Sequence, residues 1–353
     1  MTNPDRTAEN FNMLHVSKEP TMRAVVCDAP DEAMNGVSLR RIACPQPAKG
    51  QVRVRVEAAS LNPVDWKLAT GFAPWWQGTG AHVVGLDGAG VIDSVGPDVT
   101  GWKAGDRVVW HSDLNRQGVL AEFALADSHV LSRLPDDIAA TSAAALPCAG
   151  LTAYQALVRK ARLEAGQTVL VQGASGAVGG FAMQIAKARG ATVIALARKE
   201  QAPRARSLGA DHVLDRHAKD LKEQVRALTG GYGADVMLEV ANPGDARQSL
   251  DVIHYNGHLL CIDPMPVLSM VPPYTYAASI HEVALGGAYA AGHIPTQRDF
   301  AVMGDAMLEL LQQKKLDPMI EQVIPLEAAV DALKNMRKRS VSGKIVVQIG
   351  EGS

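Results

Sequence analysis

Three regularly spaced glycines near the middle of the chain have the pattern of a phosphate-binding turn. Gly173, Gly176 and Gly179 follow the segment "TVLVQ" and open a stretch with apolar residues at helical spacing. Such glycines let the backbone approach a pyrophosphate, while the free N–H groups of a helix N-terminus bind its charge. The pattern predicts a dinucleotide site on a strand, a turn and a helix. Its candidate binding residues also include Ser175, Ala177 and Val178.

The end of the next predicted strand indicates which dinucleotide binds. NAD sites carry an acid there for the ribose 2′-hydroxyl, whereas "ATVIALARKE" ends in Arg198 and Lys199. A charge-assisted hydrogen bond from Arg198 to a 2′-phosphate contributes about 1.5–3 kcal/mol, which favours NADPH. Two alternatives stay open: both cations belong to a solvated helix start, or Glu200 binds the ribose and permits some use of NADH.

The surrounding pattern predicts an α/β fold with two domains. Residues 22–134 read as short strands and turns, whereas residues 147–287 alternate strands with helices, which is typical of a parallel sheet covered on both faces. The remaining segment has predicted helices at 300–314 and 326–336 and a last strand, "KIVVQI". It is too short for its own core, so we expect 22–146 and 288–353 to form one domain and 147–287 the other. Residues 1–21 are expected to be a disordered extension.

Composition excludes several classes of protein. The 353 residues include 35 basic and 37 acidic side chains, which argues against nucleic-acid and membrane partners. The four cysteines lie far apart and suggest neither disulfides nor a metal knuckle. The first 21 residues lack the features of a signal or transit peptide. We therefore expect a soluble cytoplasmic protein.

Several longer segments carry a family resemblance. "LPCAGLTAYQAL", "GQTVLVQGASGAVGGFAMQIAKARGATVIALAR" and "SLGADHVLD" resemble the cofactor domain of the medium-chain dehydrogenase/reductase superfamily, in its zinc-independent quinone oxidoreductase (zeta-crystallin-like) branch. "AASLNPVDWKLATG", "GLDGAGVIDSVG" and "SGKIVV" extend the resemblance over residues 22–349. It implies a GroES-like β-rich catalytic domain, built from both chain ends, and an inserted doubly wound Rossmann domain.

The resemblance also bears on metal binding. Zinc-dependent relatives have Cys in place of Asn62 and Gly-His-Glu in place of Gly85-Leu86-Asp87, and the four-cysteine zinc lobe is missing here. We therefore expect no metal and take His111 to be a surface or cleft side chain. Without a Lewis acid, the expected reaction is hydride transfer from NADPH to a quinone or an α,β-unsaturated carbonyl.

Further site residues are assigned by the resemblance. Asn62 and Asp65 are the catalytic candidates at the nicotinamide side, and Asn62 is also a cofactor-binding candidate, although "NPVD" is also a good turn. Thr152 either binds the cofactor or caps a helix, and Lys344 either approaches the phosphates or borders a strand. Arg216 either stacks on adenine or lies in solvent. Cys261 and Ile262, at the end of a predicted buried strand, complete the cofactor-binding candidates.

The acceptor side and the partners are less defined. Candidates for an aromatic slot are Trp66, Trp75, Trp76 and Trp110, although tryptophan in a β-rich domain commonly belongs to the core. The segment after Cys261 could form a lid or a subunit contact through Tyr274 and Tyr276. We expect a homodimer paired through the Rossmann domain, near "VALGGAYA". The alternatives are an enoyl reductase acting on an acyl or polyketide chain and a non-catalytic NADPH-binding sensor.

Overall fold

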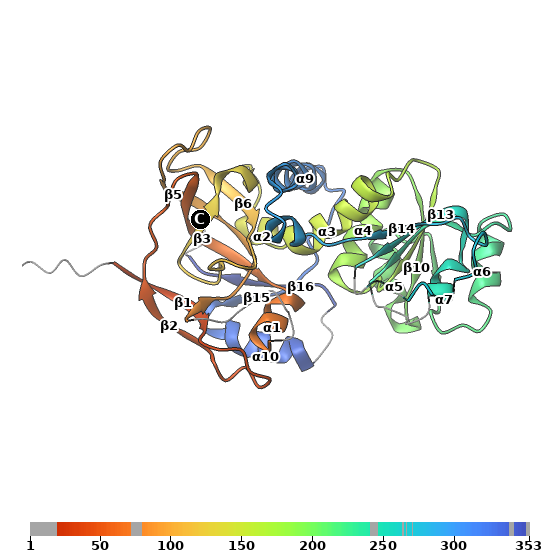
Figure 1. Ribbon diagram of the computed structural model, residues 1–353, viewed down its shortest axis with the longest axis horizontal. Helices are drawn as coiled ribbons and strands as arrows, with labels where there is room; N and C mark the ends of the chain where they lie inside the picture. The colour runs from red at the N-terminus through yellow and green to blue at the C-terminus, as the bar shows by residue number, and fades with distance from the viewer. Residues whose placement is uncertain are drawn as a thin grey trace, which may run out of the picture.

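Both ends of the chain contribute to one β-rich body, and the middle forms a second body around a parallel sheet (Figure 1). The computed structural model describes residues 20–71, 80–240, 246–262, 265, 267–269, 271–338 and 342–350. This arrangement confirms the predicted fold class, a GroES-like domain together with a Rossmann-type domain. The exact domain boundaries stay a prediction.

β3 lies at the centre of the first body: its first half buries the alternating valines Val52 and Val54, and residues 56–61 are all buried. The main sheet has the order β15 (Ile320–Pro325), β16 (Lys344–Gln348), β3 (Gln51–Leu61), β5 (Asp87–Val95), β6 (Arg107–His111) and β8 (Ser132–Arg133), with β7 (Phe123–Asp127) also paired to β3. A smaller sheet has the order β2 (Val37–Ala43), β1 (Thr21–Cys27) and β4 (His82–Val83). The antiparallel pairing of β16 with β3 explains why the C-terminal segment packs back on the first domain.

The second body contains a six-stranded sheet. Its order is β11 (His212–Leu214), β10 (Thr192–Leu196), β9 (Thr168–Gln172), β12 (Ala234–Glu239), β13 (Ile253–Cys261) and β14 (Ser279–Glu282). All five pairings are parallel, and the direction of strand succession reverses between β9 and β12. In sheets of this order, ligands bind beyond the carboxyl ends of the strands at that reversal. The helices that alternate with these strands are α4 (Ala177–Ala188), α5 (Ala202–Ser207), α6 (Leu221–Leu228) and α7 (Ala246–Leu250).

A continuous helical run joins the two bodies. It consists of η2 (Pro147–Leu151), α3 (Thr152–Tyr154) and η3 (Gln155–Lys160). In Figure 1, α2 (Ala140–Ala144), α3 and α9 (Ile294–Gln312) lie between the two sheets. The other helical elements are α1 (Pro63–Ala69), η1 (Ser128–Val130), η4 (Lys199–Gln201), α8 (Gly287–Ala290), η5 (Leu326–Ala328) and α10 (Ala329–Lys338). No helix in the described ranges is long and apolar enough to cross a membrane.

Two expectations about segment bounds need correction. Thr21 already pairs in β1, so the predicted disordered extension is too long at its end, and residues 1–19 lie outside the described residues. α9 begins at Ile294 and not at 300, because the His293 side chain accepts from the N–H of Thr296 at the N-cap. The "VALGGAYA" segment buries Leu285 and Tyr289 in the chain's own core and exposes Ala284, Gly287 and Ala290, so pairing near it stays a prediction.

Candidate functional site

The glycine turn connects the carboxyl end of β9 to the first turn of α4. Gly173 has φ +69°, and a Cβ on it would lie 2.1 Å from Cγ2 of Val240. A Cβ on Gly179 would lie 2.4 Å from the carbonyl oxygen of Gly173. At Gly176, the N-cap of α4, the nearest atom would be 3.4 Å away. Two glycines are therefore required by the turn itself, whereas Gly176 leaves open space beside the helix N-terminus.

This geometry fits a dinucleotide. Ser175, Ala177 and Val178 are half-buried around the same turn, and the first N–H groups of a helix have no intrahelical acceptor. The turn also lies at the strand-order reversal between β9 and β12, where a pyrophosphate binds in folds of this type. The predicted strand, turn and helix are confirmed, whereas their contacts with a cofactor stay a proposal.

Arg198 and Lys199 follow the carboxyl end of β10, at the same edge of the sheet as the glycine turn. Both side chains are exposed, and neither makes an ion pair with another residue in the described part of the chain. The backbone N–H of Arg198 donates to Oε1 of Gln201, 3.3 Å away. The charged ends of Arg198 and Lys199 are therefore available to a phosphate group.

The other candidates on this sheet differ in exposure. Arg216 follows β11, is exposed, and directs Nε to Nε2 of His217 at 2.9 Å. Cys261 is buried at the end of β13, where burial and the nearby Glu239 raise its pKa to about 11. Its exposure of 2% at the end of β13 confirms the predicted buried strand position, and such a thiol stays protonated near neutral pH. Ile262 is half-buried and packs against the core.

A buried polar cluster lies in the first body, where four neighbouring strands β16, β3, β5 and β6 bring residues together. We call Ser60, Asn62, Asp87, His111 and Lys344 the Asp87 cluster; all five are buried. Ser60 is opposite Asp87 in the β3–β5 register, and Asp87 is opposite His111 in the β5–β6 register. Lys344 is the first residue of β16, next to the end of β3. Strand pairing therefore sets the positions of these side chains.

The carboxylate of Asp87 is the centre of this cluster. Its oxygens accept hydrogen bonds from Ser60 Oγ at 3.1 Å and Asn62 Nδ2 at 2.9 Å, and Oδ1 lies 3.0 Å from Nδ1 of His111. Lys344 Nζ lies 3.5 Å from Oδ2 of Asp87 and donates to Oδ1 of Asn62 at 2.6 Å. Burial by itself would raise the pKa of Asp87, but the His111 hydrogen bond and the Lys344 charge outweigh it and lower the pKa. Both ends of the Asn62 amide are thus engaged within the cluster.

Asp65 is held beside the cluster in α1. Its Oδ2 accepts from the N–H of Asn62 at 2.7 Å, which turns the predicted "NPVD" turn into the start of a helix. Its Oδ1 is buried without a hydrogen-bond partner among the described residues. Burial first, and the negative charge of Asp87 second, raise the pKa of Asp65 to about 8. The carboxyl group therefore keeps a proton at neutral pH.

Other predicted residues in this body occupy different environments from those expected. Thr152 Oγ1 donates to the carbonyl of Cys148 at 2.6 Å within the helical run, so it does not cap a helix N-terminus. His111 is buried, which corrects the expectation of a surface or cleft side chain. Trp110 is also buried and donates to Ser112 Oγ at 2.7 Å, so it belongs to the core and not to an aromatic slot. Trp66 is half-buried against the core, and Trp75 and Trp76 lie outside the described residues.

The positions of Asp87 and His111 in one buried cluster are not apparent from the sequence. In the sequence, Asp87 is recognisable only as the residue in place of the Glu of the zinc motif. Its partners in the cluster lie on or beside three other strands, far away in the chain. Within the described part of the chain, no group of three or more His, Cys, Asp or Glu side chains could hold a metal ion. The prediction that the protein has no metal is not tested by this and stays a prediction.

Comparison with known proteins places this geometry in a family. Residues 48–136 match the family described as alcohol dehydrogenase GroES-like domain, and residues 177–289 match the one described as zinc-binding dehydrogenase. The chain is 32% identical over 319 residues to the chloroplast envelope quinone oxidoreductase homolog of Arabidopsis thaliana, covering 89% of this chain and 94% of the relative. The chain belongs to the medium-chain dehydrogenase/reductase superfamily. Within this superfamily it is an oxidoreductase of the quinone-oxidoreductase-like branch, and the family uses a nicotinamide cofactor.

Solved structures of the superfamily agree with the assignment. An alcohol dehydrogenase superfamily protein from Novosphingobium aromaticivorans is 30% identical, with a TM-score of 0.85, covering 93% of this chain and all of that one. The CurK enoyl reductase is 25% identical, with a TM-score of 0.81, covering 93% of this chain and 99% of that one. Quinone reductase and enoyl reductase chemistry are therefore both represented among the dehydrogenase/reductase relatives.

Proposed function

We propose that this oxidoreductase uses NADPH to reduce a quinone or an α,β-unsaturated carbonyl without zinc. The observation that carries the proposal is the pairing of the glycine turn with two exposed cations, Arg198 and Lys199, at one edge of the parallel sheet. The turn would bind the pyrophosphate, and the cations would bind a phosphate on the adenosine ribose. Sequence likeness to a quinone oxidoreductase homolog supports the acceptor class.

The cofactor-binding residues have separate tasks in this proposal. The reduced nicotinamide, when bound, supplies the hydride. The N–H groups of Ala177 and Val178 would face the pyrophosphate across the space left by Gly176. Arg198 and Lys199 would bind the 2′-phosphate, and the exposed Arg216 would lie on the adenosine side. Thr152, Cys261 and Ile262 would line the path towards the nicotinamide.

Zinc independence follows, in our proposal, from a lysine at the position of the metal site. Asn62 stands where zinc-dependent relatives have a ligand, and its Oδ1 already accepts from Nζ of Lys344. The same ammonium group lies 3.5 Å from Asp87. A positive charge is thus already paired with the residues that would otherwise attract a cation, and a second cation beside it would be repelled.

Asn62 and Asp65 would act on the catalytic side in different ways. Asn62 is a positioning residue, because its amide is engaged by Asp87 and Lys344 while its N–H holds Asp65. Reduction of an enone or quinone takes up a proton as well as a hydride. The protonated carboxyl of Asp65, whose Oδ1 has no hydrogen-bond partner among the described residues, is the proposed store for that proton.

Enoyl reduction of an acyl or polyketide chain is a second candidate function. It is favoured by the likeness to the CurK enoyl reductase and uses the same addition of hydride to a carbon conjugated with a carbonyl. The residues proposed for cofactor binding and catalysis are the same for both functions. The functions differ in the length of the acceptor molecule.

We also propose that the protein is a cytoplasmic homodimer. β14 is an edge strand of the parallel sheet, and it is half-exposed over Ile280 and His281. An unpaired edge offers N–H and C=O groups to a second copy. We therefore predict that the contact is at β14. Light scattering of the purified protein measures the molar mass, which gives the number of chains in the assembly.

The proposed reaction is tested by following nicotinamide absorbance in the presence of EDTA. NADPH and NADH are compared as donors, each with an ortho-quinone and with a linear enone. We expect faster turnover with NADPH than with NADH, and the same rate of turnover with and without EDTA. Turnover abolished by EDTA and restored by zinc would overturn the zinc-free mechanism, and equal use of NADH would overturn the assignment of Arg198.

A further inference from the structure

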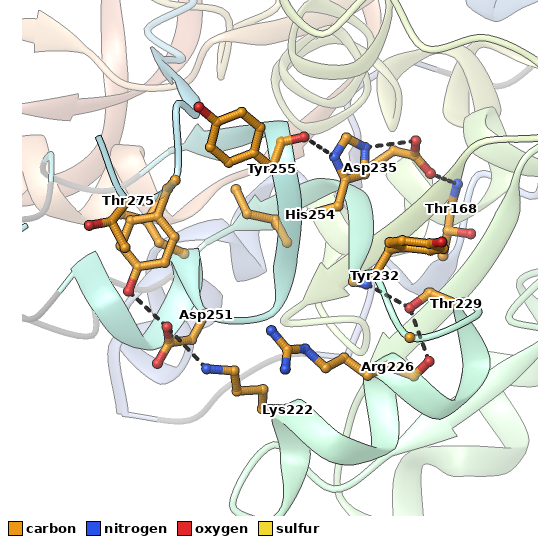
Figure 2. Close-up of a pocket in the computed structure, with 15 residues that line it drawn as sticks. Thr168, Lys222, Arg226, Thr229, Tyr232, Asp235, Asp251, His254, Tyr255 and Thr275 are labelled. Atoms are coloured by element: carbon orange, nitrogen blue, oxygen red, sulfur yellow. Dashed lines mark hydrogen bonds and ion pairs between the residues drawn. The ribbon is translucent and has the colours of Figure 1, made fainter. Parts of the chain in front are cut away.

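A hollow lies at the edge of the parallel sheet opposite the glycine turn, and Figure 2 shows the side chains that line it. It is formed where β9, β12 and β13 begin, whereas the glycine turn follows the end of β9. Its volume is about 840 Å³, within the range of about 300–1,000 Å³ usual for small-molecule sites. We call this hollow, lined by Lys222, Arg226, Tyr232, Asp251 and Tyr255, the amino-edge pocket.

Both carboxylates in the amino-edge pocket already have partners. Asp251 accepts from the hydroxyl of Tyr276 at 2.8 Å and lies 3.4 Å from Nζ of Lys222. Asp235 lies 3.0 Å from Nε2 of His254. Figure 2 shows these contacts on two sides of the pocket, with open space between them. Asp251 is therefore paired with a cation, and Asp235 is held by His254 and by the N–H of Thr168.

Arg226 brings a cation without a direct ion-pair partner among the described residues. It lies on α6, one turn after Lys222, and its guanidinium makes no ion pair or hydrogen bond to any residue that the structure describes. In Figure 2 the guanidinium reaches past Tyr232 towards Lys222 and Asp251, and no dashed line meets it. A guanidinium presents parallel N–H donors that match a carboxylate or a phosphate. The pocket thus offers a binding group for an anion.

Two tyrosines give the pocket aromatic walls. The exposed fractions are 77% for Tyr232 and 63% for Tyr255, which is unusual for large aromatic residues at ordered positions. The loop that carries Tyr232 is fixed by Thr229, whose Oγ1 accepts from the N–H of Gly233 at 2.9 Å and donates to the carbonyl of Val225 at 2.8 Å. An aromatic ring presented by a fixed loop can contact a planar ligand with little loss of conformational entropy.

We propose that the amino-edge pocket binds a planar aromatic anion, either an aryl carboxylate or an aryl phosphate. Arg226 pairs with the anionic group, and Tyr232 and Tyr255 contact the ring. The site is separate from the cofactor crevice, because it lies at the opposite ends of the same strands. It therefore does not depend on the proposed function.

The test is calorimetric titration of the full-length protein with 2-naphthoate and, separately, 2-naphthyl phosphate. We expect saturable binding of at least one of them, and the stronger one identifies the anionic group. Arg226→Gln should weaken binding at least about tenfold, because a charge-assisted bond is lost. Arg298→Gln is the matched control, since Arg298 is an exposed arginine on α9 outside the pocket, and it should bind as the wild type does.

Two further titrations separate the pocket from other sites. Excess NADPH should leave the affinity unchanged, and the neutral 2-naphthamide should bind about tenfold more weakly than 2-naphthoate. Tyr232→Leu should weaken binding without changing the thermal unfolding temperature, because the ring is largely exposed. The proposal is overturned by absence of binding at millimolar ligand, by displacement with NADPH, or by equal affinity of the Arg226→Gln protein or of the amide.

Discussion

Nζ of Lys344 lies 2.6 Å from Oδ1 of Asn62, although 282 positions separate the two residues in the chain. The contact joins the last strand of the β-rich body to the end of β3. It also places an ammonium group 3.5 Å from the carboxylate of Asp87, with all three side chains buried. The stability of the first body and the proposed absence of zinc therefore involve the same lysine.

Replacing Lys344 by Met is expected to destabilise the protein strongly. Removal of one partner from a buried ion pair leaves an uncompensated charge, here on Asp87, and costs about 3–5 kcal/mol. Chemical unfolding in urea measures the loss. The control is Lys187→Met, which breaks the ion pair with Asp211 on the half-exposed surface and should cost less than about 1 kcal/mol. Equal losses in the two variants would contradict the structural role of Lys344.

Asp65→Asn is expected to flatten the dependence of stability on pH. Because the pKa of Asp65 is raised to about 8 in the folded protein, an unfolded chain releases this proton from about pH 4 upward while the folded chain keeps it. The group therefore lowers the free energy of unfolding progressively as pH rises from about 4 to 8. Asn keeps an oxygen that can accept from the N–H of Asn62 and carries no titrating proton.

Urea unfolding of both proteins between pH 5 and pH 8 measures this effect. The free energy of unfolding of Asp65→Asn, relative to that of the wild type, should increase as pH rises. A constant difference over this range would show that Asp65 titrates normally and would remove it as the proposed proton store.

The glycine turn predicts different results for two alanine substitutions. Gly176→Ala meets no atom closer than 3.4 Å and has φ −83°, so the unfolding temperature should stay near that of the wild type. Its methyl group would enter the space proposed for the pyrophosphate, so the affinity for NADPH should fall at least about tenfold. Gly179→Ala would place Cβ 2.4 Å from the carbonyl of Gly173 and should lower the unfolding temperature. NADPH binding by Gly176→Ala at wild-type affinity would argue against the cradle.

Arg198→Ala is expected to reduce the preference for NADPH over NADH. Loss of a charge-assisted bond to the 2′-phosphate corresponds to roughly a tenfold to hundredfold change in the ratio of kcat/KM values. Arg298→Ala, an exposed arginine on α9, should leave the ratio unchanged. If the ratio of the Arg198→Ala protein equals that of the wild type, another group must select the cofactor.

Local patterns were sufficient for the cofactor half of the protein. The strand that ends at Gln172, the turn at Gly173 and the helix from Ala177 lie within about twenty consecutive residues, so their periodicity and glycine spacing predict them directly. The cations at the end of β10 were found in the same way. Family resemblance added the β-rich domain built from both ends of the chain.

Long-range packing decided the other half. The sequence indicated a surface or cleft position for His111, yet pairing of β6 with β5 buries it. For Trp110 the sequence left a core position and a place in an aromatic slot both open, and the same pairing puts it in the core. The local sequence does not reveal which strand will cover a given side chain, because burial depends on residues far away in the chain.

The sequence by itself determined the glycine turn, the cations beside it and the alternation of strands and helices, since each depends on residues close together in the chain. Only the tertiary structure decided that Asp87 gathers Asn62, His111 and Lys344, and that the guanidinium of Arg226, without a partner among the described residues, lines the amino-edge pocket. The physical reason is that hydrogen bonds, burial and shifted pKa values arise from neighbours in space, which strand pairing brings together.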